Sequence, residues 1–172
     1  MSQSMVTAIR KLGPGDSDAY RGIRLESLKA HPEAFGSSYE AQVKLPRLMF
    51  EAALENPADN RFLVGAFDKG TLVGICGFVP GVSDDFKGIA QAGTLIQMYV
   101  RPAYRGMGVG LRLVEALVKE AFKDPQIKNV VLGVREGNTA AMRVYEKAGF
   151  YEYRPTEGEV PPGFRQMVIR NY

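Results

Sequence analysis

One stretch of the chain decides the fold: residues 98–110, which read Met-Tyr-Val-Arg-Pro-Ala-Tyr-Arg-Gly-Met-Gly-Val-Gly. An apolar strand candidate, residues 90–100, stops before Pro102, and a mostly buried helical pattern begins at Gly108 and continues to Lys123. The glycines between them let the backbone approach a ligand closely and leave N–H groups pointing outward. Together with the positive end of the helix dipole, these N–H groups predict an anion site that suits a pyrophosphate.

This glycine loop matches neither of two common nucleotide-binding motifs. A kinase-type phosphate loop ends in Gly-Lys-Ser/Thr, whereas this one ends in Gly110-Leu111-Arg112. A dinucleotide fingerprint needs a third glycine at the position of Leu111. Two further interpretations of the loop stay open on this evidence: a glycine turn that binds nothing, and a nucleotide-binding regulatory domain.

The segments on either side of the loop predict a mixed sheet. Residues 61–68 and 72–79 are apolar runs joined by Asp68-Lys69-Gly70-Thr71, a hairpin signal. Helices alternate with strands only in the second half of the chain, which favours helices on both faces of the sheet. The other elements that we expect are strands at 6–11, 129–134, 150–154 and 164–171 and helices at 17–30, 46–54 and 138–148. The last strand should lie near an edge of the sheet, where an unpaired edge favours a homodimer.

The composition indicates one globular domain over residues 1–172. Hydrophobic residues make up 45% and charged residues 24%, which is close to average globular usage and disfavours a disordered or fibrous chain. The net charge of +3 comes without a basic block or stripe, so we expect no nucleic-acid partner. No apolar run approaches the ~20 residues of a membrane span, and the first residues lack a signal peptide. We therefore expect a soluble cytoplasmic protein that binds no membrane. Cys76 is the single cysteine, which excludes an internal disulfide.

A second pattern, Asn-x-x-Ala-x-x-x-Tyr-x-x-x-Gly-Phe, occupies residues 138–150. With this pattern and the Arg105-x-x-Gly108-x-Gly110 loop, the chain resembles the GNAT superfamily of N-acetyltransferases. The resemblance is strong from about residue 89 to residue 150, weaker in the hairpin before it, and nearly silent on substrate in the first 60 residues. It implies a mixed, mostly antiparallel α/β sheet of about seven strands, splayed near an acetyl-coenzyme A site and flanked by about four helices.

The same resemblance implies a role for each residue of the donor site. The main chain of residues 98–100 would pair with the pantetheine arm like an added strand, and residues 106–111 would cradle the pyrophosphate. Asn138 would hold the next strand and helix apart and bond near the pantetheine. Tyr145 would protonate the departing coenzyme A thiolate as a general acid. The full set of binding residues is Met98, Tyr99, Val100, Arg105, Gly106, Met107, Gly108, Val109, Gly110, Leu111 and Asn138.

The sequence offers a candidate for the general acid but none for the general base. A phenol on a helix that faces a cleft can donate a proton, although the spacing of Tyr145 with Ala141 and Ala148 also suits a half-buried core tyrosine. The sequence does not identify the general base. Gln97 and Gly133 occupy the two positions where branches of the family carry a carboxylate. Glu136 is near in sequence but is expected in a turn, and Glu33, Glu40, Asp84 and Asp85 are expected in loops that could line the acceptor side. A water, or an amine that arrives deprotonated, is the alternative to a side-chain base.

The sequence predicts structural roles for the other reactive side chains. Cys76 lies in an apolar strand and reads as a buried small hydrophobe, and His31, before a proline, as a helix-end or surface residue. One histidine and one cysteine predict no metal site. Phe35, Tyr39 and Phe50 fit either an acceptor pocket or helix packing.

The sequence thus predicts an enzyme that moves an acetyl group from acetyl-coenzyme A to a primary amine in a ternary complex. The acceptor is a small-molecule or peptide amine of open identity, and the use of longer acyl groups is open as well. The alternative is a non-catalytic acyl-coenzyme A-binding or sensing module of the same fold.

Overall fold

A seven-stranded sheet in the order β1-β2-β3-β4-β5-β7-β6 runs through the described part of this computed structural model. The structure describes residues 5–6, 8–32, 38–83, 86, 88–154 and 162–171. Its strands are β1 (Ala8–Lys11), β2 (Phe62–Asp68), β3 (Thr71–Pro80), β4 (Ala92–Val100), β5 (Asn129–Arg135), β6 (Tyr151–Glu152) and β7 (Phe164–Arg170). Its helices are α1 (Ser17–Ala30), α2 (Tyr39–Gln42), α3 (Met49–Glu55), α4 (Val109–Ala121) and α5 (Thr139–Ala148), with a 3-10 turn, η3, at Pro102–Tyr104.

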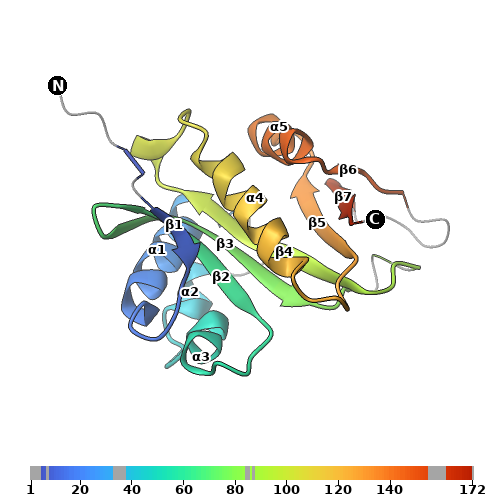
Figure 1. Ribbon diagram of the computed structural model, residues 1–172. Helices are drawn as coiled ribbons and strands as arrows, with labels where there is room; N and C mark the ends of the chain where they lie inside the picture. The colour runs from blue at the N-terminus through green and yellow to red at the C-terminus, as the bar shows by residue number, and fades with distance from the viewer. Residues whose placement is uncertain are drawn as a thin grey trace.

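The sheet separates two layers of helices, as the mixed-sheet prediction requires. The helices α1, α2 and α3 lie on one side of β1 to β4, and α4 lies across the other, with α5 beside β5 (Figure 1). Side chains alternate accordingly along β2: Leu63 and Phe67 join the core under α1 and α3, whereas Val64 and Ala66 join the core under α4. All strand pairs but one are antiparallel, so the predicted mostly antiparallel sheet is confirmed.

Two local features of the first half show how sequence sets the elements. The β2–β3 turn has Lys69 at φ +48° and Gly70 at φ +87°, the geometry of a two-residue hairpin, as predicted. The helix expected from residue 46 instead begins at Met49, because the Glu51 carboxylate accepts the Leu48 N–H at 2.6 Å. The short helix α2 lies where the sequence predicted no helix, which raises the expected four helices to five in the described ranges.

The sheet opens between its two central strands. The parallel pairing of β4 with β5 covers only residues 92–94, opposite residues 129–131, whereas β5 pairs with β7 on its other edge from Asn129 to Arg135. Along its other edge, β4 contains a bulge: Gly77 opposes Ile96 but Ile75 opposes Tyr99, so that Cys76 stands opposite two residues. The splay that the sequence resemblance implied is therefore present, and it lies beside an irregularity of β4.

The last strand lies one place in from the edge. β7 pairs with β5 along its whole length and with the two-residue β6 only at Val168 and Met167. This agrees with the expected position near an edge, and the homodimer stays a prediction that light scattering can test. None of the helices in the described residues is both long and apolar enough to cross a membrane.

Candidate active site

The open edge of β4 offers main-chain groups to a ligand. Residues 98–100 lie beyond the last β4–β5 pair, and within the described ranges no strand pairs with them on the β5 side. Buried strands rarely leave such groups without a partner, because an unmade backbone hydrogen bond costs about 1–3 kcal/mol in a buried position. The geometry therefore fits an extended ligand that adds to the sheet as a strand would.

The glycine turn ahead of α4 is open on its outer side. Gly106 has φ +78° and Gly108, the N-cap of α4, has φ +79°. A Cβ added at either residue would meet no atom within 4 Å, so backbone conformation rather than packing favours glycine here. Gly110 differs, because its added Cβ would contact Val144 at 3.7 Å and Met98 at 3.9 Å where α4 packs against α5.

The first turn of α4 presents unpaired N–H groups. No side chain caps the helix, and among the described residues no hydrogen bond uses the N–H of Val109, Gly110 or Leu111. The Val109 side chain is buried in the core and Leu111 is half-buried, whereas Met107 is exposed at the tip of the loop. The predicted cradle therefore consists of backbone donors at the positive end of a helix, the arrangement that binds phosphate groups.

Arg105 connects this loop to two other elements. Its Nε donates to the Val100 carbonyl at 3.0 Å, and its Nη2 lies 3.1 Å from His31 Nε2 at the end of α1. Its guanidinium also lies 5.7 Å from the centre of the Tyr99 ring. The sequence placed Arg105 in the donor loop but missed His31, whose position after the helix gave no sign of a contact 74 residues away.

A carboxylate on α1 completes the contacts at this end of β4. Glu26 accepts hydrogen bonds from the Tyr99 hydroxyl at 2.9 Å and from Arg101 Nε at 3.3 Å. Burial, and then the neighbouring Glu26, raise the pKa of Tyr99. The Tyr99 side chain thus faces the α1 layer.

Tyr145 is enclosed by the core on the α4 side of the opening. It is 7% exposed and meets the ring of Phe150 edge-on at 5.9 Å between centroids. Burial raises its pKa, and the nearby Cys76 raises it further. Tyr145 and Cys76, which stands opposite the β4 bulge, belong to the same buried cluster under α4. Among the described residues the hydroxyl makes no hydrogen bond, so it remains a protonated donor.

Asn138 caps α5. Its Oδ1 accepts the Ala141 N–H at 3.3 Å, which fixes the start of the helix directly after β5 and its turn. Its Nδ2 makes no hydrogen bond within the described ranges and can donate to a ligand. The helix ends at Gly149, which has φ +109° as a C-cap glycine.

The acceptor side brings together few acids. Gln97 accepts a hydrogen bond from the Tyr20 hydroxyl at 2.8 Å, and Gly133 leaves an open position on β5. Glu136 lies in the turn after β5, 3.4 Å from Arg165, and Glu40 is exposed on α2. The candidates Glu33, Phe35, Asp84 and Asp85 lie outside the described residues. The described part of the site supplies no carboxylate at either position where a base was sought.

The structure shows the surroundings of several side chains whose roles the sequence did not decide. Phe50 is fully buried and packs edge-on against Tyr20 at 6.0 Å, which makes it a core residue. Tyr39 is half-buried with Lys29 Nζ 5.6 Å from its ring centre. Cys76 is fully buried, as predicted, and burial raises the pKa of its thiol. In the described part of the chain, no three His, Cys, Asp or Glu side chains lie close enough together to hold a metal ion.

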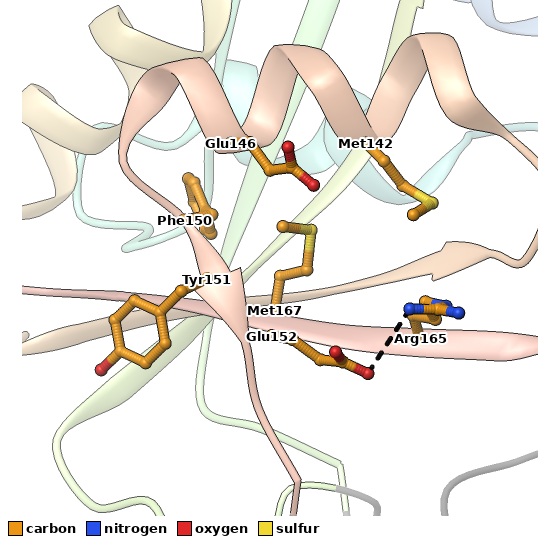
Figure 2. Close-up of a pocket in the computed structure, with 7 residues that line it drawn as sticks. All are labelled: Met142, Glu146, Phe150, Tyr151, Glu152, Arg165 and Met167. Carbon is orange, nitrogen blue, oxygen red and sulfur yellow. Dashed lines mark ion pairs between the residues drawn. The ribbon is translucent and has the colours of Figure 1, made fainter.

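A hollow of about 250 Å³ lies apart from this opening, between α5 and the strands β6 and β7 (Figure 2). Its polar rim includes Arg165, which lies 3.7 Å from Glu152. The ring of Phe150, which lines the hollow, also meets the ring of Tyr145 edge-on. The residues that line the hollow are Met142, Glu146, Phe150, Tyr151, Glu152, Arg165 and Met167, and the glycine loop contributes none of them.

An open sheet beside a helix that begins with a glycine turn defines a class of acyl-group transferases, and comparison with known proteins agrees. A model of the acetyltransferase (GNAT) family matches residues 24–150, and the chain belongs to this family. The predicted family is thereby confirmed.

Curated relatives are similar over part of their length. An aminoglycoside N(6')-acetyltransferase type 1 from Klebsiella pneumoniae is 39% identical over 54 residues, which cover 31% of this chain and 27% of that protein. A spermine/spermidine N(1)-acetyltransferase from Bacillus subtilis is 29% identical over 89 residues, which cover 51% of this chain and 57% of that protein. Each match spans less than two thirds of the relative's own length.

Solved structures share the fold. A GNAT-family acetyltransferase from Streptococcus pneumoniae superposes with a TM-score of 0.74 at 20% identity, covering 95% of this chain and 99% of that chain. An N-acetyltransferase from Thermoplasma acidophilum in complex with coenzyme A superposes with a TM-score of 0.64 at 21% identity, covering 95% and 98% of the two chains. The predicted fold is thus confirmed over almost the whole chain.

Proposed function

We propose that this protein transfers an acetyl group from acetyl-coenzyme A to a primary amine. One observation carries the proposal: β4 leaves its main chain open toward β5 and is followed, after the short turn η3, by a left-handed glycine turn with free N–H groups. An elongated molecule with a peptide-like arm and a pyrophosphate matches both features at once. Membership of the acetyltransferase family supports this choice of donor.

In this proposal, the amine nitrogen attacks the thioester carbonyl carbon, and the carbon–sulfur bond breaks. The Tyr145 hydroxyl donates its proton to the departing sulfur, and the proton lost by the nitrogen returns through water to the phenol. Burial raises the pKa of Tyr145, which keeps it protonated, and the same enclosed region raises the pKa of the Cys76 thiol. A thiolate that forms there is disfavoured in the same way, so a hydrogen bond from the phenol stabilises it as charge develops.

The acceptor is an amine of a small molecule or a peptide. Relatives named for aminoglycosides and for spermine support a small polyamine-like acceptor as the first class to test. Because the described residues supply no carboxylate at 97 or 133, we propose that the attacking amine loses its proton to water rather than to a side chain.

The test is thiol release from acetyl-coenzyme A in the presence of spermidine, kanamycin and a short peptide with a free N-terminus. We expect release above the rate without amine for at least one acceptor, together with a product heavier by one acetyl group in mass spectrometry. Coenzyme A binding without any transfer would overturn the proposal in favour of the non-catalytic binding module. Binding of ATP or NAD in preference to coenzyme A would support a nucleotide-binding regulatory domain instead.

A further inference from the structure

The β4 bulge contains a residue in a conformation that its side chain disfavours. Gln97 has φ +58°, and only three non-glycine residues of the described chain have positive φ. The other two, Lys69 and Gln91, lie in turns at strand ends, whereas Gln97 lies inside β4. Bulges of this form usually place glycine here, because a left-handed conformation strains a residue that has a Cβ. The surrounding structure must therefore hold Gln97 in place.

One hydrogen bond from α1 reaches this residue. The Tyr20 hydroxyl donates to Gln97 Oε1 at 2.8 Å across 77 residues of sequence. Tyr20 is fully buried, and burial raises its pKa to about 12, so it remains a donor throughout the neutral range. The bond also fixes which end of the Gln97 amide faces α1.

Packing fixes Tyr20 in turn. Its ring meets Phe50 of α3 edge-on at 6.0 Å, and Phe50 fills the space over Gly77, where an added Cβ would come within 2.8 Å of the ring. Gly77 is the β3 residue opposite Ile96, directly before the bulge. Contacts from α3 to β3 and from α1 to β4 thus converge on the same point of the sheet.

The bulge determines which backbone groups face the opening. Without the extra residue, Ile75 would oppose Met98, whereas with it Ile75 opposes Tyr99. Because hydrogen bonds alternate along an antiparallel strand, a shift of one residue exchanges the groups that point toward β3 with those that point toward β5. The main chain of residues 98–100, offered to the donor, therefore depends on the bulge.

We infer that Tyr20 is a positioning residue, which acts through its hydrogen bond to Gln97 to hold the β4 bulge in the form that receives the acyl donor. The inference rests on the proposed function for its kinetic readout and on β4 geometry for its structural readout. Tyr20 itself touches neither substrate.

The first experiment removes the bond from each side. Tyr20→Phe keeps the buried ring, and Gln97→Met keeps a long side chain at the same φ without the amide. Each variant should lower kcat about tenfold, in proportion to one lost hydrogen bond, with coenzyme A affinity within about twofold of wild type. The double variant should be no slower than either single variant. Fully additive losses would overturn the inference.

The second experiment distinguishes positioning from mere packing. Gln97→Gly removes the cost of the left-handed conformation, so the bulge no longer needs its tether. In this background Tyr20→Phe should lower kcat by less than about twofold, because the bond it would break is already absent. An undiminished loss there would assign Tyr20 to general core stability. Ser27→Ala is the matched control: it removes a buried hydroxyl from the same helix, one that donates to the Arg24 carbonyl at 2.6 Å.

The third experiment does not depend on catalysis. The backbone amide resonances of Gln97 and Met98 should shift in Tyr20→Phe and stay in place in Ser27→Ala. Unchanged resonances in Tyr20→Phe would overturn the inference even in an active enzyme. Shifted resonances in a chain that transfers no acetyl group would support the structural role of Tyr20 while the proposed function fails.

Discussion

Two left-handed residues, eleven positions apart, border the candidate donor site and have opposite surroundings. Gly108 has φ +79° with open space where a side chain would lie, whereas Gln97 has φ +58° with a side chain bonded to the buried Tyr20. The open residue is glycine because its φ is positive, and in the proposed function a ligand approaches its backbone. The enclosed residue is held by contacts from other elements. Similar backbone angles therefore have two different causes, and only the first leaves a trace in the local sequence.

The largest expected effect comes from filling the open position. Gly108→Val adds a β-branched side chain at positive φ, which strains the turn and blocks the approach to its N–H groups. We expect coenzyme A affinity to fall at least about 100-fold in calorimetry, the loss of most of the contacts to a pyrophosphate. Unchanged affinity would remove the loop from the site.

Gly15→Val is the matched control for this variant. Gly15 has φ +95° in the turn before α1, and an added Cβ there also meets nothing within 4 Å. Both variants should lose similar stability, about 1–3 kcal/mol for a strained residue, but only Gly108→Val should lose coenzyme A. Equal losses of affinity would mean that strain, not the site, is responsible.

Much of the donor side was predictable because its constraints are local. The glycines at 106, 108 and 149, the strand stop before Pro102 and the Asn138 cap each follow from backbone chemistry that one residue type satisfies. The bulge was not predictable, since glutamine at a left-handed position looks like any polar strand residue. The contact of His31 with Arg105 was hidden for the same reason: both partners are ordinary surface residues until the fold brings them together.

The second prediction concerns Tyr145, the proposed general acid, which is enclosed by the core. Tyr145→Phe keeps the ring against Phe150 and removes only the hydroxyl, so binding should change little. If the hydroxyl stabilises the departing thiolate, the loss falls on kcat, by about 100-fold, or nearly 3 kcal/mol, where chemistry limits the rate. Steady-state kinetics with saturating acetyl-coenzyme A measures this.

Tyr151→Phe is the control, because that hydroxyl lies on an exposed edge strand at 48% exposure. Full kcat in Tyr145→Phe under chemistry-limited conditions would make Tyr145 a packing residue. The pH dependence of the rate gives a further test. Burial raises the pKa of Tyr145 above the ordinary tyrosine pKa of 10.0, so ionisation of this residue should not lower the wild-type rate at any pH up to 10.0.

The smallest expected effect is on the pH dependence of stability, and it tests whether water reaches the Cys76 thiol opposite the bulge. Burial raises the pKa of the Cys76 thiol above its ordinary value of 9.0, so the folded chain keeps this proton while the unfolded chain begins to release it near pH 9. The stability linked to the thiol is present below pH 9 and is lost as the pH rises toward the folded pKa. Between pH 9 and pH 10, the free energy of unfolding should fall by about 1 kcal/mol more in wild type than in Cys76→Ala.

Urea unfolding followed by circular dichroism at both pH values gives this difference. The effect of the cavity left by the alanine cancels, because the cavity is present at both pH values. Tyr20 and Tyr145 are common to the two proteins and cancel as well. An equal fall in the free energy of unfolding in wild type and Cys76→Ala would mean that the Cys76 thiol ionises in the folded state. Water would then reach a region that we describe as enclosed.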